Sequence, residues 1–264
     1  MKTDDADGVR AYYERNTRLF LALGVGSKAR AIHRAVWTTG VHTAEEAFNL
    51  ANRLVLQEAE QLPAKPLRVL DLGCGVGGSL FYLARRLEKP LHTTGVTISP
   101  LQVKLAREQA EKLSLQGVCR FIEGDFMALP ELEPANLVFS IEACVHAPNP
   151  QRYFVQARRA LKPGGRLIVC DDFLSDHAAA STALTERKAL WLLAYRQGWR
   201  VPGLSSVRHV ARMAGESGLR LASDRDLTSD LRLIHLPASL VSGLIPYPSS
   251  IPRPLRRSSR SPCL

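Results

Sequence analysis

The stretch that decides the fold is Leu67-Arg-Val-Leu-Asp71-Leu-Gly73-Cys-Gly75-Val-Gly77-Gly78, a short apolar run followed by a glycine-rich turn. The run predicts a buried strand over 67–73, and the pattern after the turn predicts a helix over 77–88. Glycines at such a turn let the backbone bend tightly and approach a ligand that a Cβ atom would exclude. Free N–H groups at the start of the helix favour an electron-rich ligand group. We therefore expect a ligand site at the end of the first strand.

The sequence after this turn alternates between short apolar runs and helical patterns. It predicts further strands over 91–98, 118–124, 135–141 and 165–173, with helices over 100–113 and 151–161. Strands that alternate with helices form a parallel sheet with both faces covered, because each helix carries the chain back across the sheet. The predicted fold class is therefore α/β, a Rossmann-like, doubly wound, mostly parallel sheet.

Helical patterns precede and follow this core. Helices are predicted over 9–23 and 44–62, the second with Thr43 as N-cap and Glu46 completing a capping box. After the fifth strand the sequence predicts helices over 178–197 and 205–217 and a strand over 219–226. We expect an N-terminal helical cap over 1–62, a core over 63–240 with a lid helix at about 176–204, and a tail over 241–264.

The C-terminal tail is rich in Pro, Ser and Arg and has little apolar surface to bury, so we expect it to be disordered. It offers no final strand for the sheet, and the C-terminus is therefore predicted to be atypical and incomplete. An uncovered sheet edge favours self-association, so a homodimer is expected.

Composition favours a cytoplasmic protein. No run of the 264 residues is long and apolar enough to span a bilayer, and the N-terminus has no apolar signal segment. The five cysteines are scattered without metal-like spacing, so no metal is expected. The net charge of +10 suggests nucleic acid, but part of it comes from tail arginines and the rest is spread along helices. No nucleic-acid partner is expected.

The glycines also fit the pattern of nicotinamide dehydrogenases, because Gly73, Gly75 and Gly78 match GxGxxG. Two features oppose this interpretation. Asp71 precedes the first glycine, where a carboxylate would repel a pyrophosphate but accept hydrogen bonds from an ammonium group. No acidic residue follows about 20 residues later to hold a ribose in the usual dehydrogenase way.

The chain resembles the class I methyltransferases, whose S-adenosylmethionine loop is Asp-x-Gly-x-Gly-x-Gly. Four further stretches extend the resemblance in order along the chain, namely Tyr12-Tyr13 with Ile32-His33 and Trp37, GVTISPLQ (95–102), SIEACVH (140–146) and LKPGG (161–165). The second of these lacks the acidic residue that most members carry after the second strand. This substitution is similar to the branch of sterol, tocopherol, geranyl-diphosphate and cyclopropane-fatty-acid enzymes.

The resemblance implies S-adenosylmethionine as cofactor and assigns residues to it. The ammonium group falls to Asp71, the ribose hydroxyls to Thr97 and Gln102, and the adenine to Asp125 and Phe126. The remaining cofactor-binding residues are expected to be Gly73, Gly75, Gly77 and Ile141.

The acceptor side is expected where the fourth strand ends, at the crevice beyond the carboxyl ends of the sheet. Glu142 and His146 are the predicted catalytic residues, His146 as a base and Glu142 as a carboxylate that needs a partner. By resemblance the acceptor wall comprises Tyr12, Tyr13, Trp37, Trp191 and Tyr195. His33 and His42 are expected at the surface or in the cap.

These features predict a methyltransferase that acts on the carbon or oxygen of a small lipophilic metabolite, such as a terpenoid, a sterol-like compound or a polyketide. Two alternatives stay open. One is a relative that binds cofactor without turning it over, given the unusual C-terminus. The other is a nucleic-acid methyltransferase, although the fourth strand ends in Ser-Ile-Glu-Ala and not in the Asn/Asp-Pro-Pro-Tyr of base-modifying enzymes.

Overall fold

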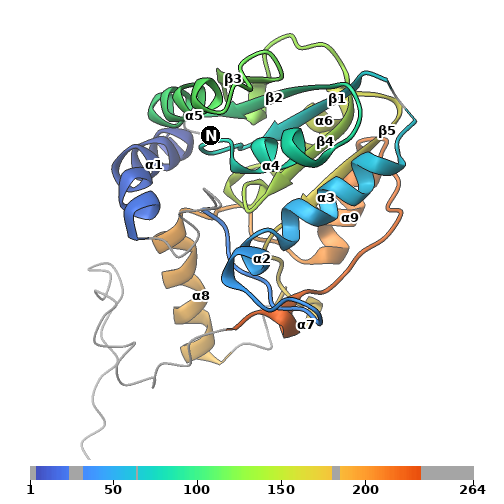
Figure 1. Ribbon diagram of the computed structural model, residues 1–264. Coiled ribbons are helices and arrows are strands. Elements are labelled where there is room, and N and C mark those ends of the chain that lie inside the picture. The colour runs from blue at the N-terminus through green and yellow to red at the C-terminus, as the bar shows by residue number, and fades with distance from the viewer. Residues whose placement is uncertain (1–3, 24–31, 64, 180–184, 233–264) are drawn as a thin grey trace, which may run out of the picture. The chain divides into compact units, whose positions relative to one another are not determined.

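The computed structural model describes residues 4–23, 32–63, 65–179 and 185–232. At its centre is a parallel sheet with the strand order β3-β2-β1-β4-β5 (Figure 1). The strands are β1 (Leu67–Leu72), β2 (Leu91–Thr97), β3 (Cys119–Glu123), β4 (Ala135–Ile141) and β5 (Leu161–Cys170). All predicted core strands are present, although the fifth ends at Cys170 and not at Phe173. The Rossmann-like α/β fold is confirmed.

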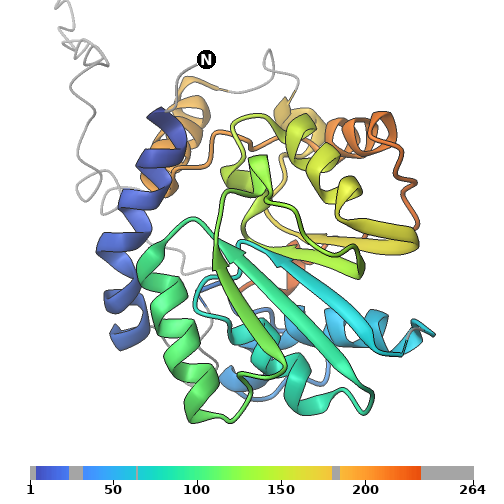
Figure 2. The same ribbon diagram turned by 90° about the horizontal axis from the view of Figure 1, so that it is seen from above.

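Helices cover both faces of the sheet (Figure 2). One apolar cluster joins the strands to α3 (Leu50–Gln61), α4 (Gly78–Arg86) and α5 (Pro100–Lys112). A second cluster joins the other face to α6 (Pro150–Arg159) and α9 (Val207–Glu216). This double cover explains why the central strands β1 and β4 are nearly continuous apolar runs, since both of their faces are buried.

The strand order places a switch point between β1 and β4. From β1 the chain winds outward through β2 to β3, and it then returns to β4 on the other side of β1. The loops after β1 and β4 therefore diverge and leave a crevice beyond the carboxyl ends of the strands, where α/β proteins bind their ligands.

The N-terminal helices differ in one respect from the prediction. α1 runs over Asp4–Leu23, but the predicted helix over 44–62 is wrong as a single helix, because it is divided into α2 (Ala44–Phe48) and α3. Asn49 separates them: its ψ of 3° departs from the helical value, while its backbone N–H and its side-chain amide both donate to the Glu45 carbonyl, at 3.0 Å and 2.9 Å. The capping box of Thr43 and Glu46 is confirmed.

The predicted helix over 178–197 is also wrong as a continuous element. The structure has α7 (Asp176–Ala179) and α8 (Glu186–Trp199), and the hydroxyl of Thr185 caps α8 by accepting from the Lys188 N–H at 3.4 Å. The following helix, α9, lies within the predicted 205–217 and has Ser206 as its N-cap.

The predicted strand over 219–226 is wrong. In the described residues this segment pairs with no strand. Leu219 is half-buried against the core, and the residues after it are exposed, with Leu221 at 57%. Two leucines are too few to bury a strand face, and the chain instead reaches the N-terminal cap, where Leu231 forms an antiparallel bridge with Val36. The predicted tail over 241–264 lies outside the described residues. No described helix is long and apolar enough to cross a membrane.

Candidate active site

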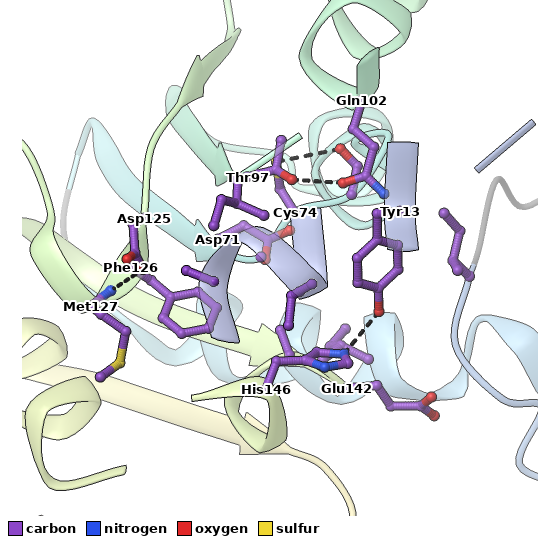
Figure 3. Close-up of a pocket in the computed structure, with 18 of the residues that line it drawn as sticks. Tyr13, Asp71, Cys74, Thr97, Gln102, Asp125, Phe126, Met127, Glu142 and His146 are labelled. Atoms are coloured by element: carbon purple, nitrogen blue, oxygen red, sulfur yellow. Dashed lines mark hydrogen bonds between the residues drawn. The ribbon is translucent and has the colours of Figure 1, made fainter. Parts of the chain in front are cut away.

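A cavity of about 460 Å³ lies at the carboxyl ends of β1, β2 and β4 (Figure 3). Its size is ordinary for a pocket that holds a small organic ligand. The wall is built from α1, the loop after each of these strands, and the short 3₁₀ helix η1 (Phe126–Ala128) that follows β3. The cavity therefore occupies the crevice that the strand order creates.

The glycine-rich loop has the backbone conformation that its sequence predicts. Gly73, Gly75 and Gly77 all have positive φ, which side chains rarely allow. Gly73 and Gly75 line the cavity. Gly77 does not lie among the lining residues: a Cβ atom there would meet the Phe121 ring at 2.6 Å, so this glycine allows the loop to pack on β3. Gly78, the first residue of α4, lines the cavity instead.

The Asp71 carboxyl lies in the cavity wall beneath this loop (Figure 3). The residue is only 3% exposed, and no side-chain hydrogen bond to it occurs in the described part of the chain. Burial raises the pKa of Asp71 well above its usual value. An isolated buried carboxyl becomes favourable as an ion only beside a cation, so this position is suited to a positively charged ligand group.

Thr97 and Gln102 are joined by a hydrogen bond at the end of β2. The Thr97 hydroxyl donates to Gln102 Oε1 at 2.6 Å, and Gln102 Nε2 donates to the Thr17 hydroxyl of α1 at 3.1 Å. Both side chains line the cavity and are buried. After β2 the cavity wall therefore offers uncharged hydrogen-bond donors and acceptors in place of a carboxylate.

Asp125 and Phe126 lie together where β3 gives way to η1. Asp125 caps η1, because its Oδ1 accepts from the Met127 N–H at 2.7 Å. The Phe126 ring lines the cavity and makes an edge contact with Tyr153, with 5.5 Å between the ring centroids. The pair offers a flat apolar surface beside a carboxylate, which is what a nucleobase with an exocyclic amine requires.

Glu142 and His146 lie on the side of the cavity away from Thr97 and Gln102 (Figure 3). Ile141 also lines the cavity. Glu142 has a φ of 48°, a conformation that costs a residue with a side chain on the order of 1 kcal/mol. Its Oε1 accepts from the backbone N–H of Arg34 at 2.9 Å and from Arg34 Nε at 3.2 Å. The segment that carries Arg34 therefore holds the Glu142 carboxylate in place.

Arg34 also connects Glu142 to the residues that follow β5. Its guanidinium pairs with Asp172, and Asp172 accepts a hydrogen bond from the hydroxyl of Tyr195 on α8. The neighbouring Asp171 is half-buried and accepts from the Val145 N–H at 3.0 Å. Burial raises its pKa to about 7.

Tyr13 and His146 form a hydrogen-bonded pair with a defined direction. His146 Nδ1 lies 2.8 Å from the Arg200 carbonyl, which can only accept, so Nδ1 carries the proton. Nε2 is therefore the acceptor, and the Tyr13 hydroxyl donates to it at 2.9 Å. Burial lowers the pKa of His146 and raises that of Tyr13, so both groups are neutral at pH 7.

Several residues expected at the acceptor wall lie elsewhere. Tyr12, Trp37, Trp191 and Tyr195 are not among the residues that line this cavity. Trp37 packs in the cap beneath the guanidinium of Arg232. Tyr195 does not contact the cavity, but its hydroxyl donates a hydrogen bond to Asp172, which follows β5.

The structure adds residues that the sequence analysis missed. His33 belongs to the predicted cap, one of the two places expected for it, and it also lines the cavity, which the sequence analysis did not predict. Arg34 gave no local signal, because the contact that defines it is made with Glu142, far away in the sequence. The sequence could have indicated Asp171 and Asp172, since carboxylates that directly follow an apolar strand need hydrogen-bond or ionic partners.

The sequence model of a family described as Methyltransferase domain matches residues 63–202. Cycloartenol-C-24-methyltransferase 1 from Oryza sativa subsp. japonica is 29% identical over 231 residues, which are 87% of this chain and 63% of that protein. A sterol 24-C-methyltransferase from Gibberella zeae is 40% identical over 122 residues, which are 45% of this chain and 31% of that protein. The chain thus spans less than two thirds of the length of these relatives.

A solved structure of geranyl diphosphate methyltransferase in complex with GPP and sinefungin has a similar fold. Its TM-score is 0.71, with 87% of this chain and 86% of that chain covered and 16% of the residues identical. At that identity the likeness concerns the fold.

Proposed function

Because the chain belongs to the methyltransferase domain family, we propose that it transfers a methyl group from S-adenosylmethionine to a small lipophilic acceptor. The observation that carries the proposal is the buried carboxyl of Asp71 in the wall of the cavity, which has no hydrogen-bond partner among the described residues. Such a group requires a cationic partner, and the ammonium group of the cofactor is one.

The other cavity residues suit the rest of this cofactor. Thr97 and Gln102 would bind the ribose hydroxyls, and Asp125 with Phe126 would hold the adenine. When bound, the cofactor supplies a methyl group already activated on a sulfonium sulfur. The chain therefore has to orient the acceptor, exclude water and accept a proton.

The acceptor side of the cavity favours an uncharged or cationic molecule. Glu142 lines this side of the cavity, and its carboxylate pairs with the guanidinium of Arg34, which also pairs with Asp172. Because two carboxylates share this one guanidinium, an anionic headgroup beside Glu142 would be repelled. A neutral terpenoid, sterol-like compound or polyketide fits this surface.

Tyr13 and His146 provide a route for the proton. If the acceptor is a hydroxyl, its oxygen forms the new C–O bond as the C–S bond breaks. Tyr13 then takes up the hydroxyl proton as it passes its own proton to His146 Nε2. If the acceptor is an alkene carbon, the carboxylate of Glu142 stabilises the resulting cation, and the same pair accepts the proton that is lost.

Calorimetry with S-adenosylmethionine and with its demethylated product tests the cofactor half of the proposal. Asp71→Asn should weaken binding at least tenfold, as expected for the loss of about 1.4 kcal/mol or more from a charged hydrogen bond. Asp224→Asn, a matched change at an exposed carboxylate, should bind as the wild type does. Absence of binding by the folded wild-type chain would refute the proposal.

Turnover is tested with labelled cofactor and a panel of neutral lipophilic acceptors. Glu142→Gln should spare cofactor binding and lower kcat, whereas Glu131→Gln at an exposed position should change neither. Unchanged turnover in Glu142→Gln would remove Glu142 from the mechanism.

A further inference from the structure

One helix, α1, presents one face to the cavity and another to solvent. On α1, Val9 and Tyr13 line the cavity, whereas Tyr12, Arg15 and Leu19 follow one another at helical spacing on a different face. Leu19 is 51% exposed, an unusual degree of exposure for a leucine near a ligand cavity. Part of the apolar surface of α1 is therefore not buried in the protein core.

The end of α8 extends the outer face of α1. The Tyr12 ring lies 6.5 Å from the Trp199 ring and 6.1 Å from the Phe20 ring, measured between centroids. Trp199 is 49% exposed. Figures 1 and 2 show α8 next to α1. We call the four residues Tyr12, Leu19, Phe20 and Trp199 the outer apolar patch.

The surroundings of the patch are basic. Arg15, Arg18 and Arg200 are exposed, and none of them forms an ion pair with a residue that the structure describes. No acidic residue occurs on α1 between Arg15 and Leu23, or over 190–200 at the end of α8. The charge near the patch thus has the same sign as the net charge of +10.

We propose that the outer apolar patch and its arginines dock on an anionic lipid bilayer. Trp and aliphatic side chains enter the headgroup boundary, and nearby arginines pair with lipid phosphates. A second copy of this surface would bring like charges together, and a nucleic acid offers no partner for an exposed leucine. Docking would place the α1 wall of the cavity against the lipid phase. This inference does not depend on the identity of the cofactor.

Vesicle binding by the full chain tests the proposal. The chain should cosediment with vesicles of equal parts phosphatidylcholine and phosphatidylglycerol, and much less with phosphatidylcholine alone. Tryptophan emission should shift to the blue on binding, and Trp199→Ala should lose most of that shift. Arg15→Gln with Arg18→Gln should weaken binding about thirtyfold, since each of the two arginines near an anionic surface contributes about 1 kcal/mol. Leu19→Ser provides a second test should Trp199→Ala fold poorly.

Two controls separate the patch from other surfaces. Val155→Ala removes a hydrophobic side chain of similar exposure from α6 and should bind as the wild type does. Glutamine in place of the tail arginines removes charge outside the patch, at Arg253, Arg256, Arg257 and Arg260. Wild-type binding by the patch variants, with loss only in the tail variant, would overturn the proposal. So would equal affinity for polyuridylate without a blue shift on vesicles.

Discussion

Asp71 links the ionisation of a buried carboxyl to ligand binding. Its pKa is raised by burial, so the carboxyl holds its proton more tightly than an ordinary aspartate does when no cation is near. An ammonium group at hydrogen-bond distance favours the carboxylate, so binding of S-adenosylmethionine should release a proton. For the same reason, affinity should increase as the pH rises toward the pKa of the free carboxyl.

Proton release is measured by titration calorimetry in two buffers with different ionisation enthalpies. The apparent binding enthalpy of the wild type should differ between the buffers, and that of Asp71→Asn should not. Identical enthalpies for the wild type would show that Asp71 is already ionised before the ligand arrives.

Asp171 makes stability depend on pH in the direction opposite to most carboxylates. Its pKa is raised to about 7 in the folded chain, above its value when unfolded. Below about pH 4 both states hold the proton and the group has no effect. Between about pH 4 and 7 only the unfolded state releases it, so stability falls by up to a few kcal/mol as the pH rises.

Asp171→Asn should remove this dependence and keep an oxygen for the Val145 N–H. Urea unfolding should therefore find the variant at least as stable as the wild type at pH 7.5, with its advantage shrinking toward pH 4.5. An advantage that is constant across this range would contradict the raised pKa.

At the level of elements, one carboxylate of α1 joins this helix to the start of α5, in addition to the hydrogen bonds of Tyr13 and Thr17. Glu14 Oε1 accepts from the Leu101 N–H at 3.0 Å and from the buried hydroxyl of Ser99, at the N-terminus of α5. A negative charge is favourable there because the helix dipole and free N–H groups point at it. We infer that Glu14 holds α1 against the cavity.

Glu14→Ala should lower the free energy of local unfolding of α1 by about 1.5–3 kcal/mol, the range for hydrogen bonds to a charged group. Hydrogen exchange should become at least tenfold faster in α1 and stay unchanged in β1 and β4. Arg15→Ala, at an exposed neighbouring position, is the control. Uniform acceleration throughout the chain would indicate global destabilisation and not a local fastening.

At the scale of the whole molecule, the described sheet ends at β5, which pairs with β4 on one side only. Most residues of β5 are half-buried, unlike the buried runs of β1 and β4. An unpaired strand edge favours association between copies. The dimer expected from the sequence therefore stays a prediction. Light scattering should find a mass that increases with concentration, and a constant monomer mass would contradict it.

Local sequence patterns predicted most of the architecture, and the family resemblance drawn from the motifs is confirmed. The alternation of apolar runs and helices predicted all the core strands, because burial on both faces imposes its own pattern. The failures lie where local patterns are ambiguous: Asn49 and Thr185 begin new helices within helical patterns, and the segment over 219–226 lacks a strand to pair with.

The sequence by itself determined the loop after β1, since positive φ at Gly73 and a carboxylate just before it are local requirements. Only the tertiary structure decided how the acceptor side is assembled. Arg34 meets Glu142 from 108 residues away, and Tyr13 meets His146 from 133 residues away. Such pairs depend on where α1 and the cap dock, and docking is governed by the sum of many weak apolar contacts that no short pattern encodes.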